Sequence, residues 1–114
     1  PNSVTSIGKT AFLACKSLTS IIIPSSVTAI SEQAFYHCES LTSITIPNSI
    51  KTIGGNAFYN CQSLTSITIP NSVVDIDKNA FKTCNKLKTI YFNSETQKEK
   101  FKDCFRTDAQ LIVQ

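Results

Sequence analysis

The chain has 114 residues, of which 41% are hydrophobic and 17% are charged, and its formal net charge is +3. These values are typical of one folded domain and exclude a disordered chain. The sequence contains no apolar run near the roughly 20 residues of a membrane-spanning helix, and no signal-peptide pattern. We therefore expect this segment not to insert into a membrane.

Proline recurs at the equally spaced positions 1, 24, 47 and 70, and the residues between the prolines recur with it. Such self-similarity predicts a stacked-repeat architecture, with four repeats over residues 1–92. Repeat arrays act through an extended surface rather than through a catalytic cleft. The chain opens on the first residue of a repeat without the polar end cap that a solenoid needs, so we expect it to be a segment of a longer protein.

Each repeat opens with a turn, since Pro-Ser-Ser or Pro-Asn-Ser supplies turn residues in all four of them. Two apolar residues three positions apart follow, such as Val27 and Ile30, and an irregular extended stretch that turns both inward is expected. Next comes a segment with apolar residues at helical spacing, in the second repeat Ala34, Phe35 and Cys38. The residue three before each such alanine is Gly, Ser or Asp, which are favoured N-cap types. This pattern predicts a helix of about two turns in every repeat.

The repeat ends in alternating apolar residues, such as Leu41, Ile44 and Ile46, which predict a short strand terminated by the following proline. Stacking then places the strands about 4.8 Å apart in a parallel ladder. The predicted fold class is α/β: a right-handed solenoid with parallel strands on the concave face and short helices and turns on the convex face.

Residues 93–114 depart from the period, and we interpret them as a degenerate C-terminal capping repeat made of a helix and a final strand. Ser94 and Gln97 form a capping-box pair at the expected helix start. The sequence from Phe101 to Cys104 echoes that from Phe81 to Cys84, but follows it at a shorter interval than the repeat period. The apolar residues expected to face the core are Phe101, Cys104, Phe105, Leu111 and Val113.

Eight of the eleven basic residues lie beyond residue 77, where acidic residues are interleaved with them. A nucleic-acid-binding surface has a cleaner basic stripe, so we expect a solvated cap and no nucleic-acid partner.

Four cysteines recur with the same period as the prolines, at positions 15, 38, 61 and 84, and Cys104 lies outside the series. All four occupy the same inward position, and parallel side chains hold their Cβ atoms farther apart than a disulfide favours. A column of buried free thiols is therefore predicted, with a disulfide pair as the open alternative. Structural zinc needs closely spaced cysteines, so no metal site is expected.

No catalytic constellation is found. The single histidine, His37, holds a position that varies among the repeats and is expected on the surface. There is no Gly-rich phosphate loop, and no paired carboxylates occur before Asp75. The sequence predicts neither enzyme activity nor a cofactor.

The outward strand positions form columns that consist mostly of hydroxyl side chains. The candidate partner-binding residues are Thr19, Ser20, Ile22, Thr42, Ser43, Thr45, Thr65, Ser66, Thr68, Lys88, Thr89 and Tyr91. The β-propensity of threonine alone would also place it there, so a selected binding site and ordinary strand composition both remain open. An alternative site is the pair Tyr36 and Tyr59 on the convex side, able to stack on a sugar or a partner.

The recurring line Leu-Thr-Ser-Ile-Thr-Ile-Pro-Asn-Ser, followed by Ile-Gly and by Ala-Phe-x-x-Cys, resembles the BspA-like class of leucine-rich repeats over residues 1–92. The resemblance implies a leucine-rich-repeat solenoid from a cell-surface or secreted protein of bacteria or protozoa, associated with adhesion to host or matrix proteins through its concave face. It offers no catalytic residues to carry over. The leading hypothesis is thus a non-catalytic protein-binding module, and the alternatives are a structural spacer and glycan binding through the convex tyrosines.

Overall fold

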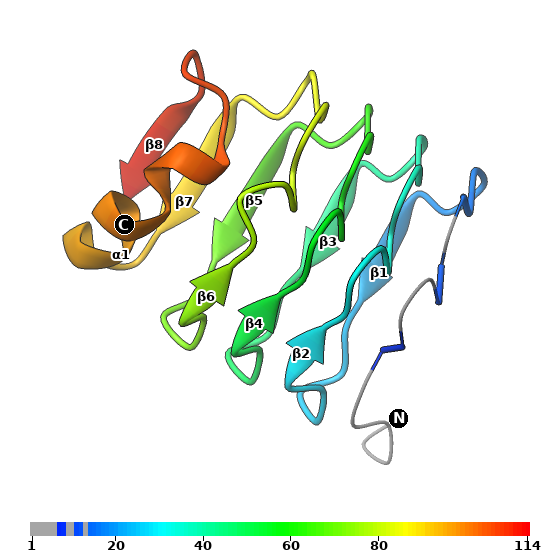
Figure 1. Cartoon of the computed structure of the whole chain (residues 1–114), viewed down its shortest axis with the longest axis horizontal. Coiled ribbons are helices and arrows are strands. Elements are labelled where there is room, and N and C mark those ends of the chain that lie inside the picture. The colour runs from blue at the N-terminus through cyan, green and yellow to red at the C-terminus, as the bar shows by residue number, and fades with distance from the viewer. Residues whose placement is uncertain (1–6, 9–10, 13) are drawn as a thin grey trace.

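The computed structural model describes residues 7–8, 11–12 and 14–114. One strand from each repeat, hereafter a coil, lies beside the strand of the next coil, and all run parallel (Figure 1). These strands are β1 (Ser20–Ile22), β3 (Ser43–Thr45), β5 (Ser66–Ile69), β7 (Thr89–Phe92) and β8 (Gln110–Val113). β1 pairs with β3, and β5, β7 and β8 form a three-stranded sheet next to that pair. The predicted parallel strands are confirmed. The handedness of the winding and the curvature of this face stay predictions.

A second parallel sheet comes from the segments that were expected to be irregular. It consists of β2 (Ala29–Ile30), β4 (Thr52–Ile53) and β6 (Asp75–Ile76), in that order. Its register pairs Ile30 with Ile53 and Ile53 with Ile76, and Ile7 forms a bridge to Ile30. Neighbouring coils are therefore joined through this sheet, through the first set of strands, or through both.

The predicted two-turn helix in every coil is wrong for the residues that the structure describes. The corresponding stretches, 32–37, 55–60 and 78–83, are consecutive turns. The amides of Ala34 and Cys38 close turns onto residues three positions earlier, whereas the amides of Phe35 and His37 bond to the next coil. Phe35 N, for example, donates to Ala57 O at 2.8 Å. The helical spacing of the apolar residues arises because this chain bends around a core, and the neighbouring coil takes amides that a helix would use internally.

The turns depend on residues in the left-handed region, where φ is positive. One column of equivalent positions has φ of 54° at Ala14, 61° at His37, 61° at Asn60 and 59° at Thr83. Asparagine adopts this conformation readily, but for other residues with a Cβ it is strained, most of all for a β-branched one such as threonine. A helix cannot continue through such a residue, which is the local reason for the turns.

Because of this strain, we expect Thr83→Asn to raise the free energy of unfolding by about 1 kcal/mol. The measurement is chemical denaturation monitored by circular dichroism. Thr107→Asn is the matched control, since Thr107 is also an exposed turn residue and is not among the positive-φ positions. An equal gain in both variants would contradict the role of backbone strain at Thr83.

The core consists of columns of apolar side chains that run through successive coils. Phe12, Phe35, Phe58 and Phe81 stack face to face, with ring centroids 5.1–5.2 Å apart and interplanar angles of 1–5°. Phe105 continues this stack, 5.0 Å from Phe81. The sequence echo pointed to Phe101 as the next member, so that alignment is wrong. Phe101 is buried elsewhere, at the end of the helix.

The chain ends with α1 (Glu95–Phe101), a short 3₁₀ turn η1 (Lys102–Cys104) and β8. Ser94 caps α1 as predicted, since its Oγ accepts a hydrogen bond from Gln97 N at 3.1 Å. The Gln97 side chain does not complete a capping box. It is buried, and its Nε2 donates to Pro70 O at 2.6 Å. This hydrogen bond anchors α1 to the turn that begins the preceding coil.

Candidate binding surfaces

The twelve predicted residues lie together along β1, β3, β5 and β7, and we call this surface the strand face. The register between paired strands aligns these residues in rows, because Ser20 pairs with Ser43 and Ser66 pairs with Thr89. The serine and threonine side chains on β1, β3 and β5 are exposed, whereas Thr89 and Tyr91 are half-buried. The strand amides are bonded between neighbours, so the surface offers mainly side-chain hydroxyls to a partner.

Apolar groups lie at both ends of the strand face. Ile22 on β1 is 80% exposed. On β7, Tyr91 pairs with Thr68 on one side and with Ile112 of β8 on the other. Sequence reasoning missed Ile112 and its exposed neighbour Gln110, although Ile112 lies between Leu111 and Val113, which were expected to face the core. For Val113 that expectation is wrong, since its side chain is exposed.

Lys88 is not a free cation on this face. Its Nζ lies 2.6 Å from Asp108 Oδ2, and Asp108 also accepts from Arg106 Nε at 2.9 Å. The hydrogen bonds from Arg106 and then from Lys88 hold the pKa of the Asp108 carboxyl well below its usual range. Lys88 therefore shares the single negative charge of Asp108 with Arg106.

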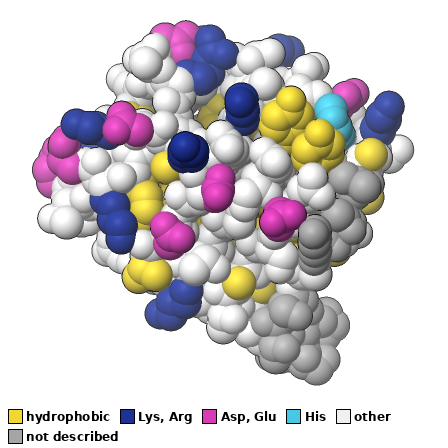
Figure 2. All heavy atoms as spheres, viewed as in Figure 1, with side chains coloured by type: hydrophobic (Ala, Val, Ile, Leu, Met, Phe, Trp, Pro, Cys, Tyr) yellow, Lys and Arg dark blue, Asp and Glu magenta, His cyan; other side chains and the backbone are white. Residues whose placement is uncertain are grey.

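The alternative site is a cluster of three half-buried aromatic side chains, hereafter the tyrosine cluster: Tyr36, His37 and Tyr59. The two tyrosine rings stack at a centroid distance of 4.8 Å and an interplanar angle of 8°. The His37 ring stands nearly perpendicular to both, 4.3 Å from Tyr36 and 5.6 Å from Tyr59. Figure 2 shows an apolar patch on the surface directly beside the histidine.

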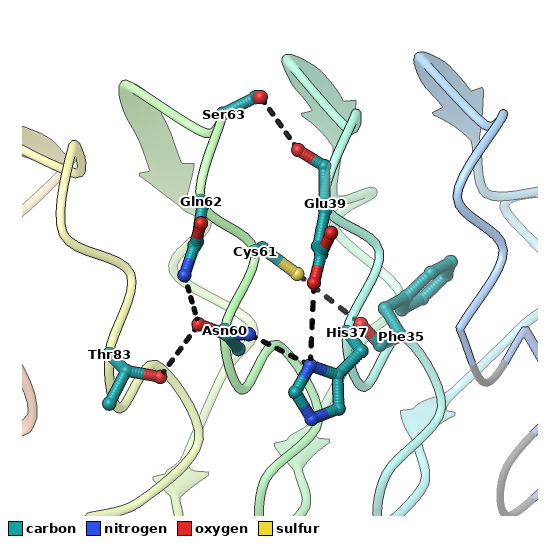
Figure 3. A network of polar contacts seen from close by, with 8 residues as sticks. All are labelled: Phe35, His37, Glu39, Asn60, Cys61, Gln62, Ser63 and Thr83. Atoms are coloured by element: carbon teal, nitrogen blue, oxygen red, sulfur yellow. Dashed lines mark hydrogen bonds and ion pairs between the residues drawn. The ribbon is translucent and has the colours of Figure 1, made fainter.

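A polar network fixes His37 beside the tyrosines (Figure 3). Asn60 Oδ1 accepts from Gln62 Nε2 at 2.7 Å and from Thr83 Oγ1 at 3.4 Å. This orients Asn60 Nδ2 toward His37 Nδ1, 2.8 Å away. His37 was predicted only as a surface residue. Its contacts were missed because they depend on the register between coils.

The cysteines form the predicted column of thiols. All five are free, so the disulfide alternative is not observed, and Cys38, Cys61 and Cys84 are buried. Each buried thiol donates to the carbonyl of a phenylalanine in the preceding coil, Cys84 Sγ to Phe58 O at 2.9 Å, for example. Over the described ranges, no three His, Cys, Asp or Glu residues are arranged to hold a metal ion. The described residues also include no helix of the length and apolarity that a membrane crossing requires.

Comparisons with solved structures reveal similar proteins. A leucine-rich cell surface protein of Faecalibacterium prausnitzii A2-165 matches with a TM-score of 0.83 and 39% identity, over 88% of this chain and 26% of that one. A leucine-rich repeat protein of Bacteroides capillosus ATCC 29799 matches with a TM-score of 0.73 and 37% identity, over 80% and 64%. A leucine-rich repeat protein of T. pallidum matches with a TM-score of 0.64 and 25% identity, over 96% and 63%. The chain thus spans less than two thirds of each of these proteins.

No curated protein matches the chain. The family described as "BspA type Leucine rich repeat region (6 copies)" matches residues 1–110, almost the whole sequence. The parallel strands, the repeated core columns and these similarities agree with one another. The chain belongs to the BspA-type leucine-rich repeat family.

Proposed function

We propose that this chain is a non-catalytic module of a surface or secreted protein and binds a host or matrix protein through the strand face. The observation that carries the proposal is the set of exposed hydroxyls aligned in register across neighbouring strands. Membership of a repeat family that is generally non-enzymatic supports it. Similarity to a bacterial protein described as a cell surface protein supports the location.

The strand face has the composition of a protein-binding surface. Serine and threonine hydrogen-bond in several directions and lose little rotamer entropy when ordered. Ile22 at one end, and Tyr91 with Ile112 at the other, provide apolar and aromatic anchors of the kind that dominate binding energy.

We expect Thr68→Lys and Tyr91→Ala each to weaken binding by about tenfold or more. Lysine at position 68 places an unpaired charge in the interface, and alanine at position 91 removes an anchor. The measurement is surface plasmon resonance against purified collagen, laminin and fibronectin. Thr52→Lys is the matched control, because Thr52 is an exposed threonine on β4, in the other sheet.

Equal affinity in the wild type and both strand-face variants would remove this surface from the proposal. An equal loss in Thr52→Lys would show that added charge, rather than its position, weakens binding. A wild-type chain that binds none of the matrix proteins would favour the structural spacer.

A further inference from the structure

We propose that the tyrosine cluster is a saccharide-binding site, separate from the strand face and formed by Tyr36, His37 and Tyr59. The side chains of the cluster do not recur in every coil. The position of Tyr36 and Tyr59 is occupied in the fourth coil by Lys82, and that of His37 and Asn60 by Thr83. The other aromatic residues that the structure describes belong to the core columns, except Tyr91 on the strand face.

The cluster combines aromatic surface with unused hydrogen-bonding groups. Neither phenol hydroxyl hydrogen-bonds to another described residue. Because His37 Nδ1 accepts from Asn60 Nδ2, the proton of the neutral imidazole lies on Nε2. Figure 3 shows this second nitrogen pointing away from the network. Two hydroxyls and one N–H are thus available beside the rings.

These groups are the complement of a sugar ring. Stacking leaves one face of each tyrosine ring uncovered by its partner, and aromatic faces carry partial negative charge that attracts the polarised C–H bonds of a pyranose. Saccharide hydroxyls both donate and accept, so they can pair with the phenols and with His37 Nε2. The Glu39 carboxylate, 3.8 Å from His37 Nδ1 and 42% exposed, adds an acceptor at the rim.

The His37 side chain of the site is oriented by hydrogen bonds without any ligand. His37 and Asn60 occupy left-handed backbone positions in adjacent coils, and Gln62 and Thr83 hold the Asn60 amide in one orientation. A ligand therefore does not have to order these side chains, which lowers the entropic cost of binding. The two stacked rings match the size of one or two sugar units and are much smaller than the roughly 800 Å² of a protein partner's footprint. The ligand class is a neutral glycan.

The experiment is a glycan array probed with the whole chain, followed by titration of the saccharides bound. The chain has three tyrosines and no tryptophan, and two of the three belong to the cluster, so tyrosine fluorescence reports mainly on the cluster. We expect Tyr36→Ala and Tyr59→Ala to weaken binding by about tenfold or more, and Tyr59→Phe, which keeps the ring, to weaken it only severalfold. Circular dichroism confirms that each variant is folded.

Tyr91→Ala is the control, because it alters the strand face and should leave saccharide affinity unchanged. The two sites are thereby tested independently, since Tyr59→Ala should in turn leave binding of matrix proteins unchanged. Three results would overturn the assignment: no glycan bound by the wild type, wild-type affinity in both the Tyr36→Ala and the Tyr59→Ala variant, or a peptide rather than a saccharide bound at the cluster.

Discussion

Phe58→Ala is expected to lower the free energy of unfolding by about 3–5 kcal/mol. Phe58 is fully buried and stacks on Phe35 at 5.2 Å and on Phe81 at 5.1 Å, so its removal leaves a cavity between two coils. The surrounding rings are held by their own coils and cannot close this cavity fully. Because domains of this kind are stable by only about 5–15 kcal/mol, the loss brings the chain close to unfolding. Urea denaturation of the variant measures it.

Phe12→Ala provides the comparison for the same substitution. Phe12 is half-buried and, among the described residues, stacks only on Phe35. We expect a smaller loss than at Phe58, because less apolar surface is exposed and no cavity is enclosed on both sides. Equal losses of unfolding free energy at the two positions would show that a ring packed between two others stabilises the chain no more than a ring at the end of the stack.

The thiols of Cys38, Cys61 and Cys84 should react with Ellman's reagent at least about 1,000-fold more slowly in the native protein than in denaturant. Their sulfur atoms are buried and donate to backbone carbonyls, so the reagent reaches them only when coils separate. Burial raises the pKa of Cys38, and a hydrogen bond with Cys84, together with burial, raises that of Cys61. At Cys38 and Cys61 the raised pKa reduces the fraction of reactive thiolate further. A hydrogen bond with Cys61 lowers the pKa of Cys84, so that thiol is protected by its burial alone.

Cys15 and Cys104 serve as internal references for this measurement. Both are only half-buried, so they should react first, although burial also raises the pKa of Cys104. The expected time course has a fast phase of two thiols and a slow phase of three. Five thiols reacting in one fast phase would contradict the buried column, and fewer than five in denaturant would indicate a disulfide.

Sequence reasoning predicted the elements that depend on the period of the repeat. The alternation of Leu41, Ile44 and Ile46 located β3, and Ser94 located the start of α1. The helices failed because apolar residues at positions i, i+1 and i+4 fit both a helix and a chain that bends around a core. Whether the chain forms a helix or bends around a core depends on amides such as that of Phe35, which bond across coils, and on the positive φ of residues such as His37. Neither is visible in the local pattern.

For the candidate surfaces too, the features that follow from the repeat period were predictable and those that depend on contacts between coils were not. The strand face was predictable because outward positions alternate with inward ones along each strand. The pairing of Lys88 with Asp108, and the orientation of His37 by Asn60, required the register of neighbouring coils and so were missed. Phe105 rather than Phe101 extends the ring stack because α1 and η1 occupy the chain between β7 and β8. The division into four repeats and a C-terminal cap stays a prediction.

The ladders that join neighbouring coils also determine how the molecule responds to mechanical force. Their hydrogen bonds run along the axis on which the coils stack, from Ile30 to Ile53 to Ile76 on one side and from β5 to β7 to β8 on the other. A pull that separates the ends of the array puts the same tension on every coil interface, and the interfaces rupture one after another. Each coil that detaches releases one repeat of the sequence, which is up to about 80 Å long when fully extended. The stack is therefore expected to lengthen in equal steps at low force, which would let it act as an extensible tether while its remaining coils stay folded.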